Sequence, residues 1–190
     1  MAIGGFAKDE QGRIVGRAAA EAAWLPAGRE LLGQIAARPM ATISQSDFAA
    51  QVQHASGVTA LGGTNKWLAH CLAALAEANA AEGVPCLTSL VVSADGKVGE
   101  AYDDALQAYG VAPAASNRER ESRAAQDRIG CYRWAGAPEP RGGWHAKVPV
   151  TRAAPTRERV AAPKTPERAI AYCPNCFTAL PATGVCDFCA

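Results

Sequence analysis

The sequence contains no long hydrophobic run. Its most apolar stretch, residues 67–76, includes His70 and falls well short of the ~18 residues that a membrane-spanning helix needs. Lys8, Asp9 and Glu10 stand where a secretory signal would pass from a basic to an apolar region. On these two absences we expect a soluble, cytoplasmic protein with no membrane partner.

Large apolar side chains are also scarce. Leu, Ile, Val and Phe together number 33 of the 190 residues, aromatic residues make up 6%, and Ala alone numbers 43. A chain of this length holds one domain, or one domain and a small appendage, and here the core must be small. The net charge of only +1 argues against disorder throughout. The composition therefore excludes a large multidomain enzyme and indicates a compact part beside a loose part.

Recognisable catalytic motifs are missing as well. The sequence has no phosphate-binding loop of the GxxxxGK[ST] type, no GxSxG nucleophile, no HExxH zinc motif and no clustered pair of carboxylates. We therefore expect a protein without catalytic activity of its own.

Charge is distributed unevenly along the chain. Residues 1–117 carry a net charge of −4, whereas residues 118–170 carry +6. Residues 137–170 hold six of the twelve prolines and show neither helical nor strand periodicity. Proline stiffens such a segment and like charges extend it. We interpret residues 136–170 as a disordered, basic, proline-rich linker and residues 1–23 as a poorly ordered N-terminus.

Residues 24–135 show the patterning of an α+β domain that is mainly helical. Phe48 and Val52 indicate the inner face of the second helix, and Ser44 and Asp47 stand before it at capping-box spacing. The predicted helices run from near Pro26 to Pro39, from Ser44 to Gly57, from Thr64 to Gly83, over residues 102–109 and over residues 118–134.

A β-hairpin is predicted after the third helix. Residues 87–93 have the composition of a strand, Asp95-Gly96 is a turn signal, and Lys97 begins the return strand. A further short strand is expected over residues 41–44. The resulting order of helix, strand, helix, helix and hairpin is that of a winged helix-turn-helix domain, which we predict over residues 24–135.

In that architecture the third helix enters the major groove with its N-terminal residues, and the wing contacts the DNA backbone. Thr64, Asn65 and Lys66 occupy the start of the helix, and Lys97 lies on the wing. Asn can pair with adenine, and Lys can reach guanine or phosphate. The alternative for the third helix is an ordinary solvated helix face without DNA contact. The alternative for the basic segment over residues 136–170 is a linker that serves only solubility. The linker cations expected to contact phosphate are Arg152, Arg157, Arg159 and Lys164.

The most specific motif lies in residues 171–190. The pairs Cys173/Cys176 and Cys186/Cys189 are separated by nine residues, which is enough to bring them together. Four thiolates select zinc and leave no open coordination position, so the metal would be structural. The segment resembles the short zinc ribbons found at the ends of many bacterial proteins. Redox dithiols and an iron site are the alternatives to this predicted zinc ribbon.

A second resemblance covers residues 38–106. Pro85-Cys86, Val91-Val92, Asp95-Gly96 and Tyr102 follow one another as in the DNA-binding half of the O6-alkylguanine DNA alkyltransferases and their alkyltransferase-like relatives. That family carries Pro-Cys-His-Arg-Val after a helix-turn-helix, and its cysteine accepts an alkyl group. Here Leu87 follows Cys86, so no adjacent base activates the thiol. We therefore expect Cys86 to be a buried, unreactive residue.

Together these features predict a zinc-binding bacterial protein that binds double-stranded DNA in a regulatory or other DNA-associated role. One alternative is an adaptor in which the winged domain is a scaffold and the zinc ribbon docks a protein partner. A second alternative is an alkyltransferase-like protein that binds DNA lesions.

Overall fold

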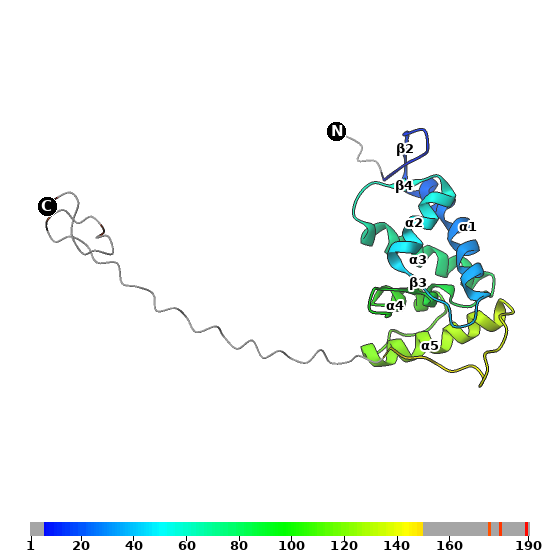
Figure 1. The fold of residues 1–190 in the computed structure, drawn as a ribbon. Coiled ribbons are helices and arrows are strands. Elements are labelled where there is room, and N and C mark those ends of the chain that lie inside the picture. The colour runs from blue at the N-terminus through cyan, green and yellow to red at the C-terminus, as the bar shows by residue number, and fades with distance from the viewer. Residues whose placement is uncertain (1–5, 150–174, 176–178, 180–188, 190) are drawn as a thin grey trace. The chain divides into compact units, whose positions relative to one another are not determined.

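The computed structural model describes residues 6–149, except for the side chains of Thr64 and Asn65, and also Asn175, Ala179 and Cys189. The chain divides into two units, residues 1–150 and residues 151–190, and the fold described here is that of the first. Its described part has an α+β, mainly helical architecture, as predicted (Figure 1). The α-helices are α1 (Arg17–Ala36), α2 (Gln45–Ser56), α3 (Thr64–Ala81), α4 (Ala101–Gln107) and α5 (Asn117–Trp134). Among them, none combines the length and apolarity that a bilayer crossing requires.

The short strands form two small sheets. Ala7–Lys8 (β1) pairs antiparallel with both Ile14–Val15 (β2) and Thr59–Ala60 (β4). Ile43–Ser44 (β3) pairs in parallel with Val91–Val92 (β5). The first sheet ties the N-terminus to the segment before α3, and Figure 1 shows it at the end of the unit away from α5.

The prediction of a poorly ordered N-terminus over residues 1–23 is wrong for the part that the structure describes. The Asp9 carboxylate accepts hydrogen bonds from the backbone N–H groups of Gln11 and Arg13, at 3.0 and 2.8 Å, and thereby closes the turn between β1 and β2. α1 begins at Arg17 instead of near Pro26, which lies inside the helix. The first turns of α1 are rich in Ala, which has high helix propensity. Burial of Trp24 adds contacts that outweigh the backbone hydrogen bond lost at Pro26.

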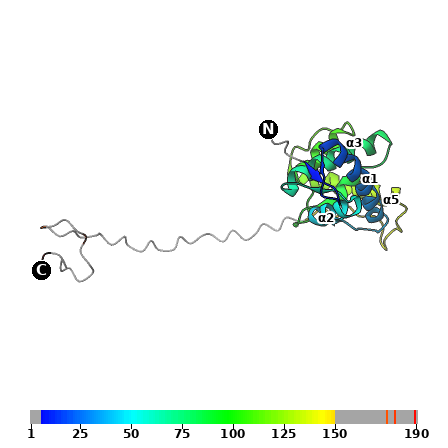
Figure 2. The same cartoon turned by 90° about the horizontal axis from the view of Figure 1, so that it is seen from above.

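The core lies where α1 meets α2 and α3 (Figures 1 and 2). Trp24 is fully buried, its ring lies 4.6 Å from that of Trp67, and its Nε1 donates to the Val58 carbonyl at 2.8 Å. The helices approach closely at Gly28, where a Cβ would lie 3.0 Å from Cδ1 of Leu75. The small side chains of α1 therefore allow a tight core to form from few large residues.

The predictions for α2 and α3 are confirmed. The Ser44 hydroxyl accepts from the Asp47 N–H at 3.0 Å, and α2 ends at Gly57, whose φ of 66° is the left-handed conformation typical of a helix C-cap. α3 begins at Thr64, and an apolar stripe at helical spacing along it is buried, namely Trp67, Leu68, Cys71, Leu72 and Leu75.

The predicted hairpin over residues 87–98 is wrong in its strands. Leu87–Leu90 forms a 3-10 helix (η1), and β5 pairs with β3 instead of with a return strand. The turn at Asp95-Gly96 forms, because the Ser93 N–H donates to the Lys97 carbonyl at 2.7 Å. Val98 follows Lys97 in the chain, and its N–H donates to the buried Glu121 side chain at 3.1 Å. Within the described residues this region is thus a turn packed on α5, without the second strand of a wing.

Part of the predicted linker belongs to the folded unit. The ring of Trp144 stacks on that of Tyr132, with the centroids 5.5 Å apart, and Ala137 also packs against the core. The Tyr132 hydroxyl in turn donates to the Ala41 carbonyl at 2.8 Å. The interpretation of residues 136–170 as a disordered linker is therefore wrong for residues 136–149, and residues 150–170 lie outside the described residues.

Candidate functional site

The predicted recognition surface on α3 is exposed. Thr64 and Asn65 are the first residues of α3, but their side chains lie outside the described part of the structure. Lys66 and His70 follow on the exposed side of the helix, opposite the buried apolar stripe, with Glu77 at the far end. The helix therefore presents one cation and one titratable imidazole near its N-terminus.

Lys97 is already paired with an acid. Its Nζ lies 2.8 Å from Asp95 Oδ2, and the Ser93 hydroxyl donates to the same carboxylate at 2.5 Å. These hydrogen bonds lower the pKa of Asp95 to about 2 and raise the pKa of Lys97. Lys97 thus stabilises its own turn, and the predicted wing contact to DNA has no support from this geometry.

Two arginines of α5, Arg120 and Arg123, also have intramolecular acid partners. Arg120 and Asp103 form an ion pair at 2.5 Å, and Arg123 pairs with Glu119 at 2.5 Å. The partners in the first pair are each 11% exposed, so this pair is largely shielded from solvent. These arginines hold α5 to α4 and to the loop before α5.

The three cysteines of the folded unit are buried thiols. Burial raises the pKa of Cys86 to about 11 and that of Cys131 and of Cys71 to about 12. The Cys86 thiol lies 3.2 Å from the Thr88 hydroxyl, and no histidine lines the cavity of about 450 Å³ that opens beside it. That cavity is also lined by Tyr109 and Asp127, and the Asp127 carboxylate accepts a hydrogen bond from the Tyr102 hydroxyl.

All of the predicted zinc ligands and linker cations except Cys189 lie outside the described residues. Cys173, Cys176 and Cys186 lie outside the described residues, and Cys189 is exposed. Arg152, Arg157, Arg159 and Lys164 also lie outside them. No cluster of three or more metal-binding side chains occurs in the described ranges, which exclude three of the four predicted zinc ligands.

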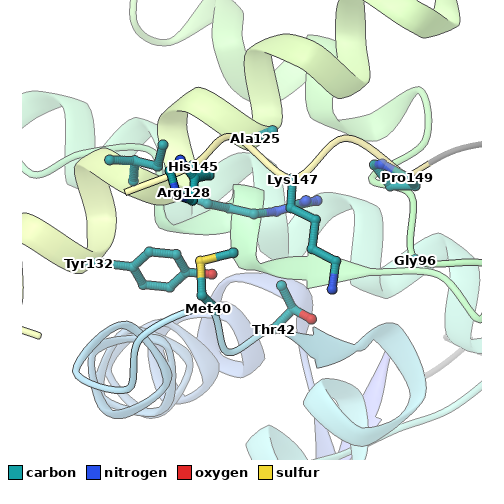
Figure 3. A pocket seen from close by; sticks show the side chains of 10 residues that line it. Met40, Thr42, Gly96, Ala125, Arg128, Tyr132, His145, Lys147 and Pro149 are labelled. Carbon is teal, nitrogen blue, oxygen red and sulfur yellow. The ribbon is translucent and has the colours of Figure 1, made fainter. Parts of the chain in front are cut away.

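A pocket that the sequence did not predict lies between α5, the loop after α1 and the segment after α5. We call it the Arg128 pocket; its volume is about 270 Å³. Figure 3 shows Arg128 and Tyr132 reaching it from α5. Lys147 and His145 reach it from the segment after α5, and Met40 and Thr42 reach it from the loop after α1. The lining is completed by Gly96, Ala125, Ile129 and Pro149.

The Arg128 pocket has an unusual electrostatic character because it contains cationic groups and no carboxylate in its lining. Arg128 is 7% exposed, and burial lowers the pKa of its guanidinium. Met40 has a φ of 62°, a strained conformation for a residue with a side chain. Trp144, a large aromatic in a proline-rich stretch, was the one signal in the sequence that this segment folds against α5.

Comparison with protein-family models, with curated proteins and with solved structures finds no match to this chain.

Proposed function

We propose that the protein binds double-stranded DNA through the exposed face of α3 and through the basic C-terminal part of the chain. The observation that carries this proposal is the position of exposed cations that lack an acid partner among the described residues. Lys66 lies in the first turn of α3, and Arg133 and Arg141 lie at the end of α5 and just after it. The described ion pairs neutralise cations elsewhere on the unit.

The fold favours α3 as the helix that contacts DNA. Its apolar stripe fixes it against α1, while α2 precedes it across the short connection that contains β4. We propose that these two helices act as a helix-turn-helix, in which the N-terminal residues of the second helix contact base edges. Lys66 occupies that end, just after Thr64 and Asn65 in the chain. We therefore propose DNA contact through the helix-turn-helix and not through a hairpin wing.

Phosphate contacts from the C-terminal part would add affinity without sequence preference. Residues 118–170 carry a net charge of +6. Neutralising DNA phosphates releases condensed counterions, so binding of this kind weakens steeply as salt rises. Arg141 stands in the segment that leads into the predicted linker cations, and one continuous basic stretch would follow the DNA backbone.

Substitution of Lys66 tests the role of α3. We expect Lys66→Ala to weaken binding of a short labelled duplex several-fold and to make the dependence of log K on log salt shallower by about 0.9, the value for one lost phosphate contact. Fluorescence anisotropy between ~50 and ~200 mM salt measures both quantities.

The matched control for Lys66 is Arg17→Ala, which removes an exposed cation that is already paired with Glu21 at 2.7 Å. We expect little change in either quantity for this variant. Equal effects of the two substitutions would remove α3 from the proposal. Binding that is undetectable for the intact protein at ~50 mM salt would favour the protein-interaction adaptor instead.

We also propose a structural zinc ion held by Cys173, Cys176, Cys186 and Cys189. A segment of this size cannot bury enough apolar surface to fold alone, so metal binding would supply its folding free energy. We expect stoichiometric zinc in protein purified without chelator, and four thiols that become reactive when a strong chelator is added. Elemental analysis and thiol titration measure this. Iron in place of zinc, or thiols that react equally fast before chelation, would contradict the assignment.

A further inference from the structure

Arg128 carries a charge that the folded unit leaves incompletely satisfied. Its Nε donates to the Ser89 carbonyl at 2.7 Å, but its Nη2 is buried and has no hydrogen-bond partner in the described part of the chain. Glu121 lies two turns earlier on α5 and its charge favours the charged guanidinium, yet the two form no ion pair among the described residues. Glu121 Oε1 accepts from Val98, and its Oε2 is buried without a hydrogen-bond partner in the same part of the chain. A buried guanidinium nitrogen that has no hydrogen-bond acceptor is unfavourable. An anion bound beside it would relieve this penalty.

The Arg128 pocket gathers a second cation and an imidazole at the same place. Lys147 extends toward Thr42 across the opening, and His145 lines the pocket from the same segment (Figure 3). The side chains come from three separate parts of the chain, and the segment that carries Lys147 and His145 is held in place by the stacking of Trp144 on Tyr132. This convergence is built into the fold and does not arise from one flexible loop.

The size and charge of the pocket indicate its ligand. A volume of about 270 Å³ is just below the ~300–1,000 Å³ typical of sites for drug-sized ligands, so a compact ligand fits. Arg128 and Lys147 together supply two positive charges, which a phosphate monoester, with its charge of about −2 at neutral pH, balances better than a monocarboxylate does. A guanidinium matches phosphate oxygens in geometry, and the Thr42 hydroxyl can donate to another oxygen.

We propose that the Arg128 pocket binds a phosphate monoester group, with Arg128 and Lys147 as the charged contacts and Thr42 as a polar one. This inference goes beyond the proposed function and does not depend on it, because the internal phosphates of DNA are diesters. The group could belong to a small metabolite or to the phosphorylated 5′ end of a nucleic acid strand.

The first test is calorimetric titration of the full chain with inorganic phosphate, with chloride at matched ionic strength as the reference. We expect saturable binding that Lys147→Ala weakens ~10-fold. Lys147 is exposed, so its substitution leaves the fold intact, whereas Arg128→Met also removes the contact to Ser89 and is therefore examined by thermal unfolding first. The matched control is Arg118→Ala, an exposed cation of α5 outside the pocket, which should bind phosphate as the intact protein does.

The second test identifies the source of the phosphate. If the ligand is a nucleic acid end, a 5′-phosphorylated duplex should bind more tightly than the 5′-hydroxyl duplex, and Lys147→Ala should abolish the difference. If it is a small metabolite, inorganic phosphate should bind while the two duplexes behave alike. Absence of saturable phosphate binding, or equal weakening by Lys147→Ala and Arg118→Ala, would overturn the inference. Binding of the 5′-hydroxyl duplex reports on the proposed function separately.

Discussion

Replacing Trp24 with Ala is expected to lower the free energy of unfolding by about 3–5 kcal/mol. Trp24 is fully buried, with the ring of Trp67 at 4.6 Å and that of Phe6 at 5.9 Å. Its removal would leave a cavity where α1, α3 and the N-terminal sheet meet, and would also leave the Val58 carbonyl without its donor. Since a small domain has a stability of only ~5–15 kcal/mol, urea denaturation followed by circular dichroism should show a large shift of the midpoint.

Two further variants separate the causes of that loss. Trp24→Phe retains most of the apolar volume but cannot donate to Val58, so we expect a smaller loss of about 1–3 kcal/mol. Trp134→Ala removes the same side chain type where it is 48% exposed, and should change stability by only about 0.5 kcal/mol. Equal destabilisation by Trp24→Ala and Trp134→Ala would mean that the core is not arranged as described.

Neutralising the predicted linker cations should have the largest effect on DNA binding. We expect the combined substitution of Arg152, Arg157, Arg159 and Lys164 by Gln to make the salt dependence shallower by about 3.6 and to weaken duplex binding at ~150 mM salt by about 10²–10³-fold. Each of the four would otherwise contact one phosphate and release the counterions condensed there. Anisotropy titrations across a salt series measure the slope and the affinity together.

The control replaces three cations that have carboxylate partners, one fewer than in the linker variant, by Gln: Arg13, Arg17 and Arg29. Exposed pairs of this kind contribute about 0–1 kcal/mol, so the fold should survive their loss. We expect this control to keep the salt slope of the intact protein. A slope that falls equally in both variants would show that only net charge matters, and would remove the linker from the proposed interface.

Local patterning was sufficient to predict the helices whose sequence signals agree with their packing. α3 shows this best, because its apolar stripe at helical spacing coincides with the residues that the core buries. α2 likewise has its cap at Ser44 and its stop at Gly57. The start of α1 was missed because Pro26 is a strong local signal for a helix start, whereas the burial of Trp24 that keeps it inside the helix is a tertiary effect.

Long-range contacts explain the other errors. Residues 87–93 have strand composition, but β5 finds its partner in β3, far away in sequence, and Glu121 takes the N–H of Val98. The Arg128 pocket was missed for the same reason. Arg128, Lys147 and Thr42 lie in three segments whose proximity no local pattern reveals, and a run of basic and proline residues resembles a linker whether or not an aromatic anchors it.

The hydrogen bond from Tyr132 to Ala41 has a consequence for the order in which parts of the unit can fold during synthesis. During synthesis the N-terminal helices leave the ribosome first and can begin to pack on one another. The Ala41 carbonyl, in the loop that carries Met40 and Thr42, then lacks its donor until Tyr132 of α5 has been made, and the pocket lining is incomplete until the residues up to Pro149 follow. The cationic pocket is therefore completed last among the described parts of the unit, and a chain that ends before residue 145 would leave Arg128 without Lys147 and His145 beside it.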